Sequence, residues 1–240
     1  PYSRMYFCSK VTKSGYIEPP LDLLILSGIL QPHFELLAID ALAERLSPDQ
    51  CREKIQAFAP DAIIFLSGYV SWKEDFEFLQ GLREEKKERL LIGIGDIFLD
   101  RQILINQPWL DAVILDFTSP AIVSYLQGMR QPLAGIVYRD GPNIVAPAAE
   151  GKKSSGLLFE IPIPRHELFI KKEYTFPFAR HLPFTTVLTD FGCGFNCPFC
   201  IYSGMPFKVR TVMNVCQELA YVHSLGIKEL FIADQTFAFD

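Results

Sequence analysis

Short β-rich runs alternate with helical patterns along most of the chain, and this alternation limits the possible folds more than any other feature of the sequence. The clearest example is residues 61–67, DAIIFLS, an apolar run of the kind found in strands that are buried on both faces. Strands that alternate with helices form parallel sheets joined by crossover helices. The sequence therefore predicts an α/β fold built around a mainly parallel sheet.

The elements predicted before residue 146 form one βα series. Strands are expected at residues 5–8, 34–40, 61–67, 90–94 and 112–115, and helices at 19–30, 48–58, 71–87, 99–106 and 120–128. Ser47 is a good N-cap for the second helix, and Pro48 suits its first turn because the missing N–H has no partner there. Residues 136–145 predict an antiparallel hairpin around Asp140-Gly141-Pro142-Asn143. One domain is therefore expected over residues 1–146.

Residues 147–181 differ in character, because Gly, Lys and Ser occupy positions 151–156 and prolines recur further along. This stretch predicts an extended linker that lies over both parts of the chain. A second βα series follows in residues 182–240. It has a strand at 185–189, a helix at 210–225 and a strand at 227–233.

Composition and charge exclude several kinds of partner. The 240 residues carry 23 Lys and Arg against 28 Asp and Glu, a net charge of −5, with no long run of like charge. Such a balance argues against a nucleic acid or an anionic membrane surface as the partner. No apolar run approaches the roughly 20 residues that cross a bilayer, and no secretion signal opens the sequence. We expect a cytoplasmic protein with reduced thiols and a small partner.

Three of the six cysteines stand within the segment CGFNCPFC, directly after the strand predicted at 185–189, as Cys193, Cys197 and Cys200. Thiolates are preferred ligands of zinc and of iron–sulfur clusters, and three so close together can converge on one polynuclear centre. A structural zinc site would need a fourth ligand, which could come from His181, His223 or Cys216. The pattern favours a metal centre over three incidental cysteines, and a cluster over zinc.

The Cys-x3-Cys-x2-Cys spacing, with an aromatic residue before the third cysteine and a strand before the first, resembles the radical S-adenosylmethionine (SAM) superfamily. The resemblance implies a [4Fe-4S] cluster in which three irons are bound by Cys193, Cys197 and Cys200. It also implies that the fourth iron binds the amino and carboxylate groups of SAM. A reduced cluster of this kind passes an electron to the sulfonium of SAM and releases a 5′-deoxyadenosyl radical. The protein orients the reacting groups and excludes water from them.

Further residues of the second half agree with the same resemblance. The segment Phe231-Ile-Ala-Asp-Gln-Thr-Phe is similar to the strand-end motif of the superfamily, which implies SAM contacts from Asp234 and Gln235. Gln235 stands where a second acid is common, so it keeps hydrogen-bonding capacity but lacks a charge for the ammonium group of SAM. Phe199 is expected to pack beside the adenine.

Residues 1–146 resemble the Rossmann-like cobalamin-binding domain that precedes the radical SAM module in one large subgroup. Five features carry this resemblance: Pro19-Pro20-Leu21-Asp22-Leu23-Leu24, the strand ending Ile39-Asp40-Ala41, the strand at 61–67, Gly93-Ile94-Gly95, and Gly135-Ile-Val-Tyr-Arg-Asp-Gly. Open α/β sheets bind ligands beyond the carboxyl ends of their strands. Cobalamin contacts are therefore expected from Ser67, Gly68, Gly95 and Thr118. No Asp-x-His-x-x-Gly motif is present, so a corrinoid is expected to bind without a protein imidazole.

The expected protein is a radical SAM enzyme that uses cobalamin in methyl transfer, cyclisation or rearrangement. Its substrate is expected to be a small molecule or a peptide, and its reductant a flavodoxin or ferredoxin. Residues 182–240 supply only the opening units of a radical SAM barrel, so this stretch of chain alone is expected to be inactive. Two alternatives stay open: a radical SAM enzyme whose first domain binds no cobalamin, and a non-catalytic module stabilised by zinc.

Overall fold

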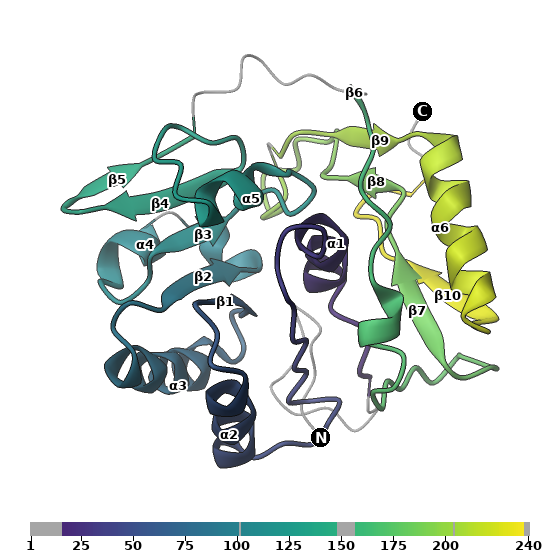
Figure 1. Cartoon of the computed structure of the whole chain (residues 1–240). Helices are drawn as coiled ribbons and strands as arrows, with labels where there is room; N and C mark the ends of the chain where they lie inside the picture. Colours follow the sequence, from purple (N-terminus) through teal and green to yellow (C-terminus); the bar gives the residue numbers. More distant parts are fainter. Residues whose placement is uncertain (1–15, 101, 148–156, 204, 238–240) are drawn as a thin grey trace.

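The computed structural model describes residues 16–100, 102–147, 157–203 and 205–237. Figure 1 shows a larger sheet with its helices on one side of the molecule and a smaller group of strands with helix α6 (Val212–Ser224) on the other. Helix α1 (Leu21–Leu30) lies between these two parts. The strand predicted at residues 5–8 falls outside the described residues. No helix of the described part is long and apolar enough to cross a bilayer.

The larger sheet contains five strands in the order β1-β2-β3-β4-β5. They are β1 (Ala62–Leu66), β2 (Leu90–Ile94), β3 (Ala112–Ile114), β4 (Ile136–Asp140) and β5 (Asn143–Val145). The first three strands run parallel, β4 runs antiparallel to β3, and β4 and β5 form a hairpin. The predicted parallel sheet and its closing hairpin are confirmed. The carboxyl ends of β1, β2 and β3 therefore meet at one edge.

The helices of this part lie close to their predicted positions. They are α1, α2 (Pro48–Phe58), α3 (Trp72–Glu85), α4 (Gln102–Asn106) and α5 (Ala121–Leu126), with a 3-10 turn η1 (Asp96–Leu99). Ser47 caps α2 as predicted: its hydroxyl accepts from Gln50 N at 3.2 Å, and the Gln50 side chain accepts from Ser47 N at 2.9 Å. The helix predicted at 99–106 starts later, because η1 occupies residues 96–99.

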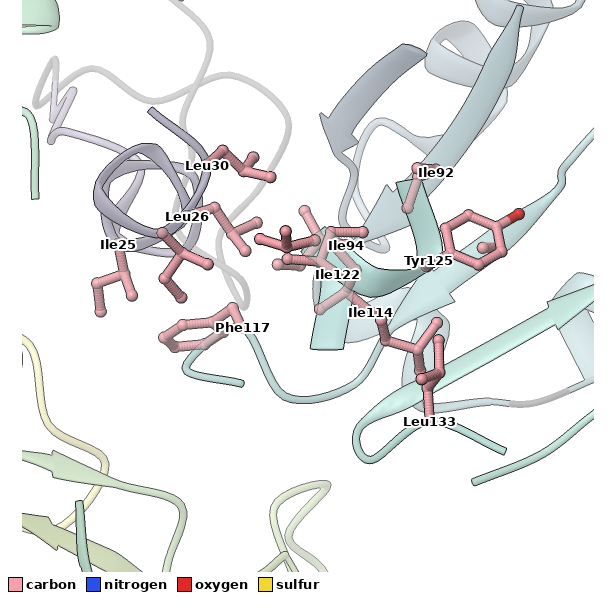
Figure 2. Packing of buried hydrophobic residues seen from close by; sticks show 14 of the residues in the cluster. Ile25, Leu26, Leu30, Ile92, Ile94, Ile114, Phe117, Ile122, Tyr125 and Leu133 are labelled. Atoms are coloured by element: carbon pink, nitrogen blue, oxygen red, sulfur yellow. The ribbon is translucent and has the colours of Figure 1, made fainter. Parts of the chain in front are cut away.

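Apolar side chains on both faces of the sheet form the core. Figure 2 shows Leu26 and Leu30 of α1 facing Ile94 and Ile114 of the sheet. The same cluster includes the fully buried Phe191 from the second half of the chain, together with Leu188 and Ile161. The two halves therefore share one hydrophobic core, with α1 as its centre.

The strand predicted at residues 34–40 is wrong: the backbone is extended there but pairs with no strand among the described residues. A groove of about 1860 Å³ is lined both by this segment and by β1. β1 is consequently an edge strand within the described part, and all its residues are half-buried instead of buried on both faces as predicted. Apolar composition alone does not distinguish these two environments.

The second half contains a βαβ unit, as predicted, in which β7 (Phe184–Val187) and β10 (Glu229–Ile232) are parallel and α6 connects them. A separate three-stranded sheet has the order β6 (Leu157–Phe159), β9 (Lys208–Arg210) and β8 (Asp190–Phe191). β6 belongs to the stretch predicted as a linker, and it pairs in parallel with β9. That stretch also contains a short 3-10 turn, η2 (His166–Leu168).

Candidate functional site

The cysteine-bearing loop runs from β8 to β9 and is fixed at its start by a glycine. Gly192 has φ +79°, and a Cβ there would lie 1.9 Å from the carbonyl oxygen of Pro206. Only glycine fits this turn, because any side chain would clash with backbone. Thr236, just past β10, donates a hydrogen bond to Cys193 Sγ at 3.0 Å. The first cysteine therefore sits against the carboxyl end of the β7–β10 pair.

Cys193, Cys197 and Cys200 are partly exposed free thiols. Cys200 N donates to Cys197 O at 3.1 Å, so the last two cysteines share one turn. Among the described residues no three His, Cys, Asp or Glu side chains are grouped closely enough to hold a metal ion. The donor set suits an iron–sulfur cluster, since all three thiols lie in one exposed loop.

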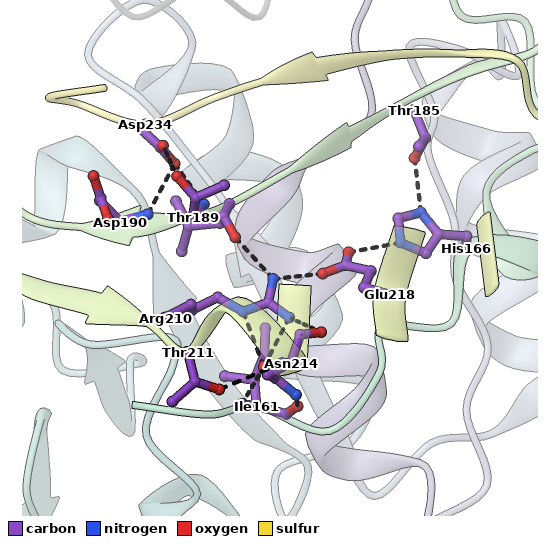
Figure 3. Close-up of polar contacts among 11 residues, drawn as sticks. Ile161, His166, Thr185, Thr189, Asp190, Arg210, Thr211, Asn214, Glu218 and Asp234 are labelled. Carbon is purple, nitrogen blue, oxygen red and sulfur yellow. Dashed lines mark hydrogen bonds and ion pairs between the residues drawn. The ribbon is translucent and has the colours of Figure 1, made fainter. Parts of the chain in front are cut away.

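Two of the predicted SAM-binding residues, Asp234 and Gln235, follow β10, and the third, Phe199, lies on the cysteine loop. The carboxylate of Asp234 accepts hydrogen bonds from Thr189 N at 2.7 Å, from Asp190 N at 3.1 Å and from the Thr189 hydroxyl (Figure 3). Asp234 therefore ties the end of β10 to the β7–β8 turn. Gln235 is exposed, and Phe199 is 89% exposed on the cysteine loop.

Asp190, next to this site, is a buried acid with a second carboxylate, that of Asp234, close by. Burial raises the pKa of its carboxyl group to about 6, and the negative charge of Asp234 adds to the rise. Two carboxylates thus meet at the turn that precedes the cysteine loop. Proton uptake at this turn is expected in mildly acidic solution.

A buried polar network lies at the strand and helix that follow the cysteine loop, β9 and α6. It was not predicted from the sequence. Figure 3 shows His166 between Thr185 and Glu218, with its ring nitrogens 2.8 Å from Thr185 Oγ1 and 2.8 Å from Glu218 Oε1. Arg210 pairs with Glu218, donates to Leu188 O at 2.8 Å, and binds the Asn214 side chain. One feature of the sequence could have indicated this network: Asn214 and Glu218 are four residues apart in the predicted helix, so they lie on the same helix face.

Three of the four predicted cobalamin contacts meet at the carboxyl edge of the parallel sheet. Gly95 has φ +122°, and a Cβ there would lie 2.2 Å from Ser67 O. Gly68 follows Ser67, whose hydroxyl donates to Asp75 at 2.7 Å. The two loops after β1 and β2 therefore touch backbone to backbone, which brings Ser67, Gly68 and Gly95 together.

Asp96 lies at the same edge and was not among the predicted contacts. It is 4% exposed, and neither carboxyl oxygen has a hydrogen-bond partner in the described structure. Burial raises its pKa. Burial, followed by the charge of Asp96, also raises the pKa of Tyr202, in the cysteine loop, to about 12. The cysteine loop also touches this part of the molecule through Met205, which packs against the core cluster that contains Ile94 and Ile114.

Thr118, the fourth predicted cobalamin contact, takes part in a second bridge between the halves. Its hydroxyl donates to Asp116 Oδ1 at 2.6 Å, and Lys208 of β9 donates to Thr118 Oγ1 and to Asp116 Oδ2, both at 2.6 Å. The Lys208 ammonium also lies 4.7 Å from the ring centre of Phe191. Thr118 lies at the end of β3, and it is joined to the second half.

Curated proteins similar to the chain are about twice its length or longer, and no protein-family model matches it. It is 28% identical over 235 residues to an uncharacterized methyltransferase of Pyrococcus horikoshii, covering 93% of this chain and 50% of that protein. It is 23% identical over 244 residues to the anaerobic magnesium-protoporphyrin IX monomethyl ester cyclase of Cereibacter sphaeroides, covering 96% and 36%. For the cyclase of the same name from Rubrivivax gelatinosus, the identity is 25% over 234 residues, covering 90% and 41%.

Two solved structures of the radical SAM methyltransferase TsrM from Kitasatospora setae share the fold. The structure with tryptophan and a SAM analogue bound has a TM-score of 0.66 at 16% identity, covering 91% of this chain and 45% of TsrM. The structure with cobalamin and a [4Fe-4S] cluster bound has a TM-score of 0.63 at 14% identity, covering 92% and 46%. The predicted fold class is confirmed. The similarities support the resemblance to radical SAM proteins with a cobalamin-binding domain.

Proposed function

We propose that the full-length protein is a radical SAM enzyme of the cobalamin-dependent type that acts as a methyltransferase or a cyclase. One observation carries this proposal: Lys208, where the cysteine loop ends, donates hydrogen bonds to Asp116 and Thr118 after β3, so the loop is held beside the carboxyl edge of the parallel sheet. The predicted cluster site and the predicted cobalamin site thus occupy neighbouring parts of the molecule. The activities named for the similar curated proteins agree with the proposal.

The cysteine loop would hold the [4Fe-4S] cluster through Cys193, Cys197 and Cys200. Such a cluster supplies the electron that cleaves SAM. Gly192 sets the path of the loop, and the Thr236 hydroxyl, which donates to Cys193 Sγ, holds this thiol at the carboxyl end of β10. Gln235 and the exposed Phe199 are free to turn toward SAM, with Gln235 as a polar contact and Phe199 as a surface for the adenine.

The sheet edge would hold cobalamin against Ser67, Gly68, Gly95 and Thr118. Gly95 lets the loops after β1 and β2 touch backbone to backbone, and open α/β sheets bind their ligands at such strand ends. We further propose a small-molecule or peptide substrate, and a flavodoxin or ferredoxin in the cytoplasm as reductant.

Metal and cobalt analysis of the full-length protein tests this proposal. After anaerobic reconstitution with iron, sulfide and hydroxocobalamin, we expect about four irons per chain, a reduced-cluster electron paramagnetic resonance signal, and bound cobalt. Cys197→Ala is expected to lose the signal. Cys216→Ala, on the exposed face of α6, is the matched control and is expected to keep it.

Two other results of the metal analysis would each contradict a different part of the proposal. Iron and sulfide without cobalt would leave a radical SAM enzyme whose first domain is an empty scaffold. One zinc without iron or sulfide would mean that the cysteine loop forms a structural zinc site and that the enzyme assignment is wrong.

A further inference from the structure

The carboxyl group of Asp96 is buried and accepts no hydrogen bond in the described structure. Its side chain is 4% exposed, and both carboxyl oxygens lack a partner in the described structure. The backbone N–H groups of Tyr69 and Ile97 lie close enough to the carboxyl group to oppose the rise in its pKa. They do not have the geometry of a hydrogen bond to either carboxyl oxygen. Burying a polar group without a partner costs stability, so native proteins rarely do so without a functional reason.

Two other acids near this sheet edge, Asp75 on α3 and Asp116 after β3, have hydrogen-bond partners, which sets Asp96 apart. Asp75 accepts hydrogen bonds from the hydroxyls of Ser67 and Ser71 at 2.7 and 2.8 Å. Asp116 accepts from Thr118 and from Lys208. The fold therefore supplies partners for acids at this edge, except for the one that follows Gly95.

We propose that Asp96 is a cofactor-binding residue whose carboxyl group pairs with a carboxamide on the rim of the corrin ring. This inference rests on the proposed binding of cobalamin at the sheet edge. The corrin ring carries primary carboxamide side chains, and their N–H groups match the unpartnered oxygens of Asp96.

The inference predicts opposite changes in stability and in binding. Replacing Asp96 removes the cost of burying an unpartnered carboxyl group, so the cofactor-free protein should become more stable. The same replacement removes a charge-assisted hydrogen bond to the cofactor, so binding should weaken about 10- to 100-fold. A residue that only supported the fold would move both quantities in the same direction.

The experiment compares full-length wild-type protein with Asp96→Asn, Asp96→Leu and the control Asp140→Asn. Asp140 is exposed in the β4–β5 hairpin. The dissociation constant for hydroxocobalamin is measured by absorbance titration under anaerobic conditions, and the melting temperature is measured without cofactor. We expect both Asp96 variants to melt higher than wild type and to bind more weakly, with Asn less affected in binding than Leu. Asp140→Asn should match wild type in both.

Three results would overturn the inference, each for a different reason. Unchanged affinity in both Asp96 variants would show that the carboxyl group does not contact the cofactor. A lower melting temperature together with weaker binding would assign Asp96 a structural role. Failure of the wild-type protein to bind hydroxocobalamin would refute the cobalamin assignment, and this inference with it.

Discussion

At the scale of single residues, acids placed in unusual surroundings mark both sides of the candidate site. Asp96 lies unpartnered at the sheet edge, while Asp190 lies buried beside Asp234 at the entry to the cysteine loop. Neither acid stands in a motif that distinguishes it in the sequence. Their properties arise from burial and from neighbouring charges, which are decided by the folded structure.

Asp190 should make the stability of the 240-residue protein depend on pH. Its pKa rises from 3.8 to about 6 on folding, so the folded protein holds a proton that the unfolded chain has lost between these values. The free energy of unfolding should therefore fall as pH rises from about 4 to 6 and not recover above 6. Asp190→Asn should remove this contribution and stabilise the protein at pH 7.5 by at most about 3 kcal/mol.

Urea denaturation at pH 4, 5, 6 and 7.5 measures this effect, with Asp100→Asn as an exposed control. Parallel curves of unfolding free energy against pH for wild type and Asp190→Asn would show that Asp190 titrates normally.

At the scale of elements, the buried polar network joins parts that are distant in sequence. His166 belongs to η2, in the stretch predicted as a linker, whereas Arg210 ends β9 and Glu218 lies on α6. All three side chains are buried. His166 is therefore buried in a network although it belongs to the stretch predicted as an extended linker. The network fixes the strand and the helix that follow the cysteine loop.

Arg210→Met should be strongly destabilising, because it leaves the Glu218 carboxylate buried without its cation. We expect a loss of about 3–5 kcal/mol in unfolding free energy, measured by urea denaturation. The control Arg165→Met removes a partly exposed ion pair with Glu167 and should cost no more than about 1 kcal/mol. The double variant Arg210→Met with Glu218→Met should be more stable than Arg210→Met alone. Equal losses for Arg210→Met and Arg165→Met would mean that the network contributes little.

At the scale of the whole molecule, the two halves are held together by apolar and polar contacts. Helix α1 and Phe191 lie in one hydrophobic cluster with the sheet, and Lys208 links β9 to Asp116 and Thr118. Lys172 of the predicted linker also binds Ala38 O at 3.0 Å. The cysteine loop is thereby held beside the sheet edge, which is the arrangement that the proposed function needs.

Lys208→Met should loosen the contact between the halves while leaving each half folded. The substitution keeps most of the aliphatic volume but removes the ammonium group from Asp116, at a cost of about 1–3 kcal/mol. Differential scanning calorimetry should show a lower and broader transition than for wild type. Lys86→Met, which removes an exposed ion pair with Asp61, is the control and should melt as wild type does. An unchanged, single sharp transition for Lys208→Met would contradict this role.

The local elements were predictable because their causes are local. The Ser47 cap, Pro48 and the alternation of apolar runs place α2 and the parallel strands from neighbouring residues alone. The segment at 34–40 has a strand-like composition, yet among the described residues it pairs with no strand, since pairing depends on where β1 lies. A strand pattern indicates the capacity to pair and does not supply the partner.

By itself, the sequence determined the α/β class, the βαβ unit of the second half and the three-cysteine loop, because periodicity, capping and ligand spacing act over a few residues. Only the tertiary structure decided which groups became buried together. His166 and Glu218 are 52 positions apart, and the unpartnered state of Asp96 depends on the loops around it. Burial and charge pairing are properties of the packed molecule, so no short stretch of sequence encodes them.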